Sequence, residues 1–350
     1  MPARLPGVLK SRMIKFSLSA LAFLFCAFVV GDELFYRLAN WPKPSYNFKE
    51  NELTKAKTML GRVLFYDPIL SADSNISCSS CHSPYNAFAH VDHALSHGIH
   101  DSIGIRNAPV LINLAWQKTF MWDGAINNLD VQSLAPISHP AEMGSNISQV
   151  VKKINRQKLY KKLFFDAYKD SIATGEHTLK AIAQFLITIV SYNSKYDKVM
   201  HQQAQFSPQE QNGYQIFKKK CAACHTEPLF TNGDFVNNGI GVDTLLNDLG
   251  RMRVTQRKED AYKFKVPTLR NIEYSYPYMH DGRFKKLGEV LNHYSNGIKQ
   301  SETLSGKLKS GITLSANEKV DLMAFLLTLS DKQFLFDSNF AYPKEFLSKQ

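Results

Sequence analysis

Two short motifs of cysteine and histidine are the residues of this chain best placed to do chemistry. Each reads Cys-x-x-Cys-His, and together they comprise Cys78, Cys81, His82, Cys221, Cys224 and His225. In such a motif the two cysteines form thioethers with a haem, and the histidine becomes the fifth ligand of its iron. The sequence therefore predicts two covalently bound haem c groups. Thiol redox chemistry and metal binding are the alternatives, but the chain lacks the further Cys/His pairs that a tetrahedral zinc site needs.

The elements that must position these motifs occur twice along the chain. Each half contains, in the same order, an amphipathic segment with one glycine, the CxxCH motif, Pro-x-Leu-x-Asn, Met-x-Asp-Gly and a strongly apolar segment. These lie at 61–65, 78–82, 109–113, 121–124 and 179–190 in the first half, and at 213–217, 221–225, 267–271, 279–282 and 320–329 in the second. We expect the first and last segments of each half to be helices, with the glycine where another helix packs closely.

A helix, a haem motif, a loop and a closing helix form the plan of a small class I cytochrome c domain. Signals for strands are few, so the predicted fold is mainly α. It consists of two class I cytochrome c-like domains related by internal duplication, with haem groups that face the domain interface. The predicted domains are residues 45–200 and 201–340, divided near the Gln-rich stretch 196–208, and a chain of 350 residues has room for both.

The N-terminus has the pattern of a segment that directs export. Basic residues precede an apolar run, Phe16–Val30, which at about 15 residues is short for a membrane span of about 20. Val29 and Gly31 offer a small-residue cleavage site, so residues 1–31 are predicted to be either a signal peptide or an N-terminal membrane anchor. Cys26 lacks small residues just before it, which argues against lipidation.

The net charge of +11 is spread along the chain in short basic runs. It is consistent with a solvated basic surface, or with a face that steers an acidic electron donor by long-range charge. Nothing beyond the basic charge points to nucleic acid, so no nucleic-acid partner is expected.

Several longer segments resemble one family. They are LGRVLFYDPILS before the first motif, RNAPVLIN, MWDG, AEMG, and PTLRN followed by PYMHDGRF. With them the chain resembles the bacterial dihaem cytochrome c peroxidase and MauG family across nearly its whole length after about Asn51. The resemblance implies an N-terminal haem at which peroxide reacts and a C-terminal haem that handles electrons, with a calcium ion and a tryptophan between them. It also implies attachment of haem outside the cytoplasm, so the mature chain is expected in the periplasm, soluble after signal cleavage or tethered to the inner membrane.

The resemblance assigns catalytic roles to three residues. Glu142 matches the family's acid–base glutamate, which moves a proton as the peroxide O–O bond breaks, and such a group typically contributes about 10²–10⁴ in rate. Without the resemblance, Glu142 would read as a helix-start or surface acid. Gln132 matches a glutamine that lines the same pocket, and the nearby His139 reads as a structural histidine. Trp122 matches the inter-haem tryptophan, which can relay an electron or simply pack a domain interface.

The calcium ligands that the resemblance implies are the Asn107 side chain and the backbone carbonyl groups of Ser275 and Pro277. Hard oxygen donors of this kind suit calcium. Serine replaces the family's usual threonine, a change that a carbonyl ligand tolerates.

The internal duplication makes its own prediction about the sixth iron ligands. Pro136 and Tyr294 stand at the same distance after the two Met-x-Asp-Gly motifs, so each is expected over the distal face of its haem. Proline has no donor atom for iron, which leaves the first haem open for peroxide, whereas tyrosine can bind iron through its phenolate oxygen. By resemblance, classical dihaem peroxidases have methionine at this tyrosine position and MauG-type enzymes have tyrosine. The rival ligands are Met279 and His293, and Tyr294 as an ordinary half-buried residue is the plainer alternative.

His97 matches the loop histidine that caps the peroxidatic haem in resting classical enzymes. Gly98 beside it would let such a loop move. His90, His93 and His100 are close by in the sequence, and an exposed loop histidine is the alternative. A ligand here is a classical feature, which contrasts with the MauG-type tyrosine.

Together these features predict a periplasmic dihaem c-type peroxidase that reduces hydrogen peroxide to water with electrons from a small cytochrome c or copper protein. The first alternative is a MauG-type enzyme that uses peroxide equivalents to oxidise residues of a partner protein. The second is a dihaem electron carrier without catalysis, which would have no use for an open iron and an acid–base glutamate. Anchoring to the inner membrane and a homodimer are both compatible with the sequence.

Overall fold

Helices make up most of the regular structure in the computed structural model, which describes residues 1–2, 34–35, 38, 40–90 and 92–348. Apart from its first two residues, the predicted signal peptide or anchor at 1–31 lies outside the described residues. The described residues from Leu34 onward form one unit of structure. None of the helices in the described ranges is long and apolar enough to cross a membrane.

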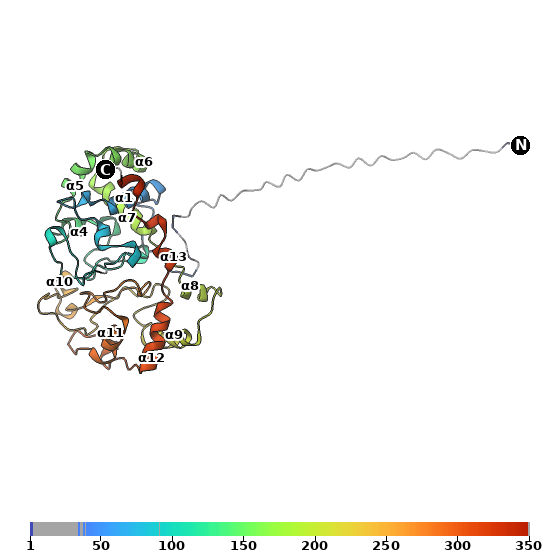
Figure 1. Cartoon of the computed structure of the whole chain (residues 1–350), viewed down its shortest axis with the longest axis vertical. Helices are drawn as coiled ribbons and strands as arrows, with labels where there is room; N and C mark the ends of the chain where they lie inside the picture. The colour runs from blue at the N-terminus through green and yellow to red at the C-terminus, as the bar shows by residue number, and fades with distance from the viewer. Residues whose placement is uncertain (3–33, 36–37, 39, 91, 349–350) are drawn as a thin grey trace. The chain divides into compact units, whose positions relative to one another are not determined.

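The two halves of the chain contribute comparable sets of helices. The first half contains α1 (Lys55–Tyr66), α2 (Cys78–Cys81), α3 (Leu129–Gln132), α4 (Leu134–Ser138), α5 (Ile147–Asn155), α6 (Lys158–Tyr168) and α7 (Gly175–Thr188). The second contains α8 (Lys195–Met200), α9 (Pro208–Lys220), α10 (Met252–Thr255), α11 (Leu287–Asn292), α12 (Ala316–Leu327), α13 (Lys332–Leu335) and α14 (Lys344–Leu347). Two short strands, β1 (Phe235–Val236) and β2 (Phe264–Lys265), pair antiparallel. The mainly α fold is thus confirmed (Figure 1).

Side-chain caps mark where the principal helices begin. Thr54 accepts a hydrogen bond from the Lys57 amide at the start of α1. Ser207 and Ser315 form capping boxes with the glutamates three residues on, at the starts of α9 and α12. Each cap satisfies amide groups that a helix leaves unpaired at its N-terminus, so the local sequence determines these starts.

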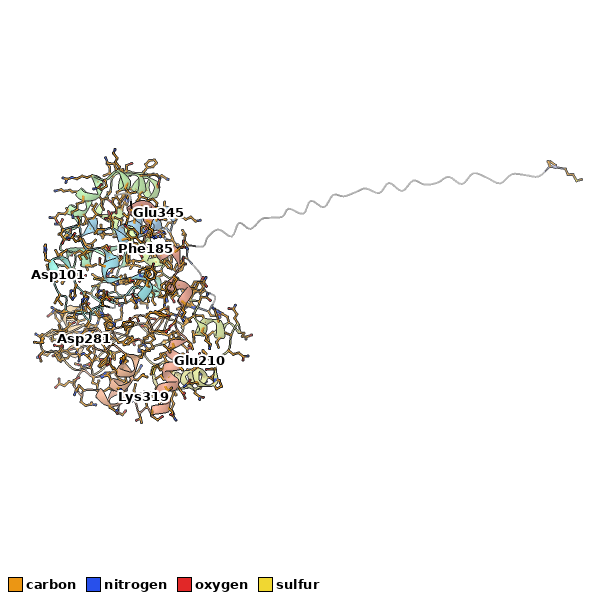
Figure 2. All side chains as sticks on the ribbon, viewed as in Figure 1. Asp101, Phe185, Glu210, Asp281, Lys319 and Glu345 are labelled. Carbon is orange, nitrogen blue, oxygen red and sulfur yellow. The ribbon has the colours of Figure 1, made fainter. Side chains whose placement is uncertain are left out.

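Each half is built around two helices that cross at a glycine. Helix α1 packs on α7 at Gly61, where a Cβ atom would lie 1.9 Å from the Ala181 carbonyl oxygen. Helix α9 packs on α12 at Gly213, where a Cβ atom would lie 1.9 Å from the Asp321 carbonyl oxygen. A side chain larger than hydrogen does not fit at either crossing, which confirms the predicted role of both glycines. Figure 1 shows the two helix pairs, and Figure 2 labels Phe185, an α7 residue at the first crossing.

A hydrophobic core surrounds each helix pair. The larger core contains buried residues of α1, α5, α6 and α7 together with Phe88. The smaller core is formed by α9, α11 and α12 together with Phe230. The residues after α12 return to the larger core, where Phe334, Phe340 and Leu347 are buried.

Helix α8 precedes the predicted domain boundary at residue 200 but packs against the second half. Tyr196 is buried in the smaller core. Both carboxylate oxygens of Asp197 accept hydrogen bonds from the Arg270 guanidinium, at 2.9 and 2.7 Å. Arg270 is fully buried, so this ion pair ties α8 to the second Pro-x-Leu-x-Asn segment. The division into domains at residue 200 stays a prediction.

The internal duplication extends to single hydrogen bonds. The amides of Phe120 and Tyr278 each donate across their Met-x-Asp-Gly turn, at 2.7 Å in both halves. Within these turns Met121 and Met279 adopt the same left-handed backbone, with φ of 69° and 75°. The two turns therefore share one structure, and residues at equal spacing from them can be compared directly.

Candidate functional site

One cavity is lined by every site residue that the sequence predicts. Its volume is about 1020 Å³, at the large end of the range for ligand pockets, and residues of both halves line it. Besides the six residues of the CxxCH motifs, the lining includes His97, Asn107, Trp122, Gln132, Pro136, Glu142, Ser275, Pro277 and Tyr294. Two groups attached at the two motifs would therefore share this cavity. That the haem groups face the domain interface stays a prediction.

The histidine of each motif is held through its Nδ1 atom. His82 Nδ1 lies 2.7 Å from the Phe88 carbonyl oxygen, and His225 Nδ1 lies 3.1 Å from those of Phe230 and Pro267. Because a carbonyl oxygen can only accept, Nδ1 carries the proton and Nε2 keeps a lone pair. Burial lowers the pKa of His82 to about 4 and also lowers the pKa of His225, so both rings are neutral at pH 7. This is the tautomer and charge state of an axial iron ligand, and the carbonyl groups orient the rings.

The four motif cysteines form no disulfide. Burial raises the pKa of Cys78 and of Cys221 to about 12, so both are neutral thiols at pH 7. Thiol redox catalysis and zinc binding use the thiolate, which this burial disfavours. Within the described ranges, no group of three or more His, Cys, Asp or Glu side chains is arranged to hold a metal ion. Covalent haem attachment is the interpretation of the motifs that these environments fit best.

Glu142 lies in the turn that follows α4, and its side chain is 32% exposed. Burial raises the pKa of its carboxyl group, although His139 partly offsets that rise. His139 Nδ1 lies 3.8 Å from Glu142 Oε1. The Glu142 carboxylate adds to the rise in pKa that burial causes at Cys78 and Cys81, so it lies within electrostatic reach of the first motif. A carboxyl group with a raised pKa in a cavity wall can take up a proton more readily than an exposed one and release it again.

The loop that carries His97 packs on the backbone of Glu142. A Cβ atom on Gly98 would lie 2.3 Å from the Glu142 carbonyl oxygen, so this glycine serves a close contact. The Cys81 thiol donates to the His97 carbonyl oxygen at 3.6 Å. Of the four histidines in this loop, His97 lines the cavity, and the His93 ring stacks on it with centroids 4.2 Å apart. His97 is thus the loop histidine that lies beside the first motif.

Gln132 and Pro136 lie on the short helices α3 and α4 that border the cavity. Gln132 Nε2 donates to Met121 Sδ at 3.5 Å. The Pro136 ring has no donor atom for a metal, and its carbonyl oxygen accepts from the Met143 amide at 3.2 Å. Position 136 therefore offers the cavity an apolar surface.

Tyr294 lies in a π-helical turn, η6 (His293–Gly297), that continues from α11. Such a turn often marks a functional site. Burial raises the pKa of the Tyr294 hydroxyl to about 12, and a hydrogen bond with the Asn238 side chain partly offsets the rise. Cys221 and Cys224 add to it, so the phenol lies within electrostatic reach of the second motif.

Asn238 is a residue of this site that the sequence analysis missed. Besides its bond with Tyr294, its Nδ2 donates to Met279 Sδ at 3.4 Å. Its carbonyl oxygen accepts from His293 Nε2 at 3.1 Å, which directs that ring away from the cavity, whereas Met279 lines it. No pattern in the loop 231–250 singles out Asn238, because the first half has no equivalent loop to compare.

Trp122 is fixed through both its indole and its backbone. Its Nε1 donates to the Asn107 carbonyl oxygen at 2.8 Å, and its own carbonyl oxygen accepts from the Lys265 amide at 2.7 Å. The Asn107 amide in turn donates to the His280 carbonyl oxygen at 2.7 Å. Trp122 therefore lies at a contact between the two halves and lines the shared cavity, a position that suits both packing and electron relay.

The candidate calcium ligands border the same contact. Asn107 Nδ2 donates to the Ala94 carbonyl oxygen at 2.9 Å, and no described residue donates a hydrogen bond to Asn107 Oδ1. Ser275 and Pro277 line the cavity together with Asn107. One amide oxygen and two carbonyl oxygens are neutral, hard donors that fit calcium, with water as further ligands.

A charged network surrounds the first Met-x-Asp-Gly turn. The Arg106 guanidinium donates to Asp248 at 2.6 and 2.9 Å and to Asp123 at 2.6 Å. Burial alone would raise the pKa of Asp248, but the bonds from Arg106 hold it below its usual value. Arg251 donates to the Asp123 carbonyl oxygen at 2.9 Å. Charged residues of the second half thus hold the turn that carries Trp122.

Comparison with known families gives two matches along the chain. The family model of di-haem cytochrome c peroxidase matches residues 55–205, and that of cytochrome c matches residues 210–330. The two matches correspond to the two halves that the internal duplication defines.

Known proteins match most of the chain. The methylamine utilization protein MauG of Methylorubrum extorquens is 34% identical over 293 residues, which cover 80% of this chain and 80% of that protein. The cytochrome c551 peroxidase of Nitrosomonas europaea is 32% identical over 279 residues, which cover 78% and 80%. A solved structure described as a MauG-like protein associated with microbial copper homeostasis is 29% identical, with a TM-score of 0.78, and covers 88% of this chain and 99% of its own.

Proposed function

Because the chain belongs to the di-haem cytochrome c peroxidase family, we propose that it reduces hydrogen peroxide to water with electrons from a small redox protein. Members of this family are oxidoreductases that carry haem c. One observation carries the proposal: the two CxxCH motifs, an acid–base candidate and a donor-free proline all line one cavity.

The CxxCH motifs would hold two haem c groups, with His82 and His225 as iron ligands through Nε2. Bound there, haem supplies an iron that can bind peroxide and exchange electrons. The carbonyl groups of Phe88, Phe230 and Pro267 keep Nδ1 of the two rings protonated and hold the rings in one orientation.

The two halves differ at Pro136 and Tyr294. Proline offers the first side no donor atom for iron, so a small substrate can enter there when His97, the candidate loop ligand of that side, is not bound. Tyr294 offers a phenol oxygen on the second side, which suits a site that handles electrons. Its pKa of about 12 keeps the hydroxyl protonated at pH 7, and its use as a ligand would require the loss of that proton.

Glu142 would serve as the acid–base group of the first side. Its carboxyl group, with a pKa raised by burial, would accept a proton from the inner oxygen of peroxide. It would then return that proton to the outer oxygen, which leaves as water. The His97 loop supports Glu142 by packing on its backbone.

Trp122 would relay electrons between the two halves. The bonds at its indole N–H and its carbonyl oxygen fix the ring in the cavity wall. The oxygen atoms of Asn107, Ser275 and Pro277 would hold one calcium ion beside this contact.

A MauG-type function is the second candidate, and Tyr294 is the observation that favours it. A phenolate oxygen stabilises oxidised iron relative to reduced iron, which suits a site that holds oxidising equivalents for a partner protein. A carrier without catalysis is disfavoured, because Glu142 beside the donor-free Pro136 would serve no purpose in it.

The proposed setting is the periplasm, with residues 1–31 as a signal peptide or an inner-membrane anchor. The electron donor would be a small cytochrome c or copper protein. The net charge of +11 would steer an acidic donor toward this chain.

A turnover assay separates the candidate functions. The purified chain, with two haems per polypeptide in the pyridine haemochrome assay, is given peroxide and a small reductant, alongside its Glu142→Gln variant. Repeated turnover that depends on Glu142 supports the peroxidase. Reaction with peroxide that turns over only when a protein substrate is added supports the MauG-type alternative. Failure to react with peroxide leaves the electron carrier and contradicts the proposal.

A further inference from the structure

Lys265 reaches from β2 of the second half to a segment of the first. Its Nζ donates to Gln117 Oε1 and to the Thr119 carbonyl oxygen, both at 2.7 Å. The same Nζ lies 5.8 Å from the centroid of the Phe120 ring. Its backbone amide donates to the Trp122 carbonyl oxygen at 2.7 Å. One residue of the second half therefore holds the segment 117–122 at several points.

The internal duplication identifies what this ammonium corresponds to. Residues of the two halves pair at the constant spacing that separates the two Pro-x-Leu-x-Asn motifs. That spacing pairs Asn107 with Lys265, Gln117 with Ser275, and Thr119 with Pro277. Each pair contains one candidate calcium ligand: Asn107 in the first pair, Ser275 in the second and Pro277 in the third. The counterparts of the three calcium ligands are thus Lys265 and the two residues that accept hydrogen bonds from its ammonium.

Two reciprocal hydrogen bonds support this correspondence in space. The Asn107 amide donates to the His280 carbonyl oxygen, and the Lys265 amide donates to the Trp122 carbonyl oxygen, each at 2.7 Å. His280 and Trp122 are themselves counterparts, as the second residues of the two Met-x-Asp-Gly motifs. The two contacts are therefore equivalent, and one presents a neutral amide where the other presents an ammonium.

Charge is what distinguishes the two positions. Asn107 offers an oxygen atom, so any cation held there must come from outside the chain. Lys265 brings its own cation to the oxygen atoms of Gln117 and Thr119. Burial lowers the pKa of Lys265 to about 8, an effect that Asp123 partly offsets, so most of the ammonium stays protonated at pH 7.

We propose that the Lys265 ammonium is a built-in cation at the counterpart of the candidate calcium site, and that it positions Trp122. The segment 117–122 is fixed in this way without a metal ion, whereas the side at Asn107 is open to one. Lys265 is a positioning residue, because it contacts the segment that carries the indole and not the reacting atoms. The comparison of the Lys265 ammonium with a calcium ion rests on the proposed function. The contacts of Lys265 do not depend on it.

Chemical rescue of a Lys265→Ala variant tests for a cation at this position. In the protein with both haems, the apparent Tm should fall by roughly 3–10 °C, because two bonds from a charged donor are lost. Ammonium or methylammonium chloride should restore most of this loss. Tetramethylammonium chloride at the same ionic strength should not, because that ion has no N–H group to donate and is too large to fit. A Lys265→Ala protein that keeps both haems and shows no rescue overturns the proposal.

A second pair of variants decides the matter if the alanine variant does not fold. Lys265→Met keeps most of the length without charge, and Lys265→Arg keeps a cation. The methionine variant should lose stability and ignore ammonium, whereas the arginine variant should stay close to the parent. Equal stability of the two variants overturns the proposal, as does recovery of the methionine variant with ammonium.

A spectroscopic signature reports on the positioning of Trp122 itself. The ultraviolet resonance Raman bands of this indole, assigned by difference from a Trp122→Phe variant, depend on its N–H hydrogen bond. These bands should shift in Lys265→Met and stay in place in Lys265→Arg. Bands that are unchanged in Lys265→Met would leave Lys265 as a merely structural residue and overturn its positioning role.

A calcium chelator separates this proposal from the calcium assignment. If the chelator lowers the Tm of the parent and calcium restores it, the calcium assignment is supported, and rescue of Lys265→Ala by ammonium then supports both cation positions. If the chelator changes nothing while ammonium still rescues Lys265→Ala, the calcium assignment fails and the role of Lys265 stands.

Discussion

Replacing Glu142 with glutamine removes a proton-transfer group while keeping its size. The side chain lines the cavity and lies within electrostatic reach of the first haem motif, and burial raises its pKa. A positioned acid–base group contributes about 10²–10⁴ in rate, which corresponds to about 2.7–5.5 kcal/mol of transition-state stabilisation. We therefore expect Glu142→Gln to lose two to four orders of magnitude in peroxide turnover, with both haems retained.

His139 provides the matched control for this prediction. Its Nδ1 lies 3.8 Å from Glu142 Oε1, and its side chain is 51% exposed. An exposed ion pair of this kind contributes less than about 1 kcal/mol, so His139→Ala should reduce turnover by no more than about fivefold. The charge on His139 lowers the pKa of Glu142, so its removal should raise that pKa and move the acidic limb of the rate profile to higher pH.

The assay is steady-state peroxide consumption with a small reductant, measured as a full profile of rate against pH. Haem content and resting absorption spectra are measured in parallel to show that each variant is loaded. Glu142→Gln activity within a few-fold of the parent would refute the acid–base role. If His139→Ala lost as much activity as Glu142→Gln, the assignment of the proton transfer to Glu142 alone would be wrong.

Three further predictions test other parts of the structure. Trp122→Phe keeps most of the packing but removes an easily oxidised ring, so electron transfer between the haems should slow in stopped-flow spectra; unchanged transfer would leave a packing residue. Gly61→Ala should lower the free energy of unfolding by about 1–3 kcal/mol, because its Cβ would lie 1.9 Å from a backbone oxygen. Gly288→Ala in α11, with nothing within 4 Å, should be neutral or stabilising, and equal effects of the two changes would contradict the helix crossing. Arg106 holds the pKa of Asp248 below its usual value although burial alone would raise it, so this pair stabilises the fold above about pH 4 and loses that effect as the pH falls further. The difference in urea stability between the parent and Asp248→Asn should therefore shrink in acid, and a constant difference would argue against the pair.

Much of the fold could be predicted because its signals are local and occur twice. The CxxCH motifs and the glycines at 61 and 213 each stand in a pattern whose second copy confirms the first. A Cβ atom added at Gly61 or at Gly213 would lie the same 1.9 Å from a backbone oxygen, so the two patterns report the same packing requirement. A repeated pattern separates such a requirement from chance in a way that a single glycine cannot.

Contacts between distant segments could not be predicted in the same way. The apolar residues Phe334 and Phe340 indicate burial, but nothing in their spacing says that they return to the core of the first half. Tyr196 of α8 likewise packs against the half that follows it. Apolar composition determines that a residue is buried, whereas the partner depends on the whole tertiary arrangement.

In the site, too, residues with a counterpart in the other half could be predicted from the sequence, whereas residues without one could not. Pro136 and Tyr294 stand at equivalent positions of the two halves in the sequence, and both line the cavity. The same spacing pairs Asn107 with Lys265, but lysine has no ligand atom for a cation, so the sequence alone does not mark this pair as part of a site. Asn238 lies in a loop without a counterpart, so only the three-dimensional structure brings it to Tyr294.

The difference between the two sides of the cavity is tested most directly by the electron paramagnetic resonance spectrum of the resting ferric protein and of its Tyr294→Phe variant. If Tyr294 is the sixth ligand of the second haem, the variant should gain a high-spin signal at that haem while the first haem keeps its own. Met279→Leu, at the rival position that also lines the cavity, should leave the spectrum of the parent unchanged. A Tyr294→Phe spectrum that matches the parent, or a high-spin signal in Met279→Leu instead, would contradict the assignment of the two sides of the cavity.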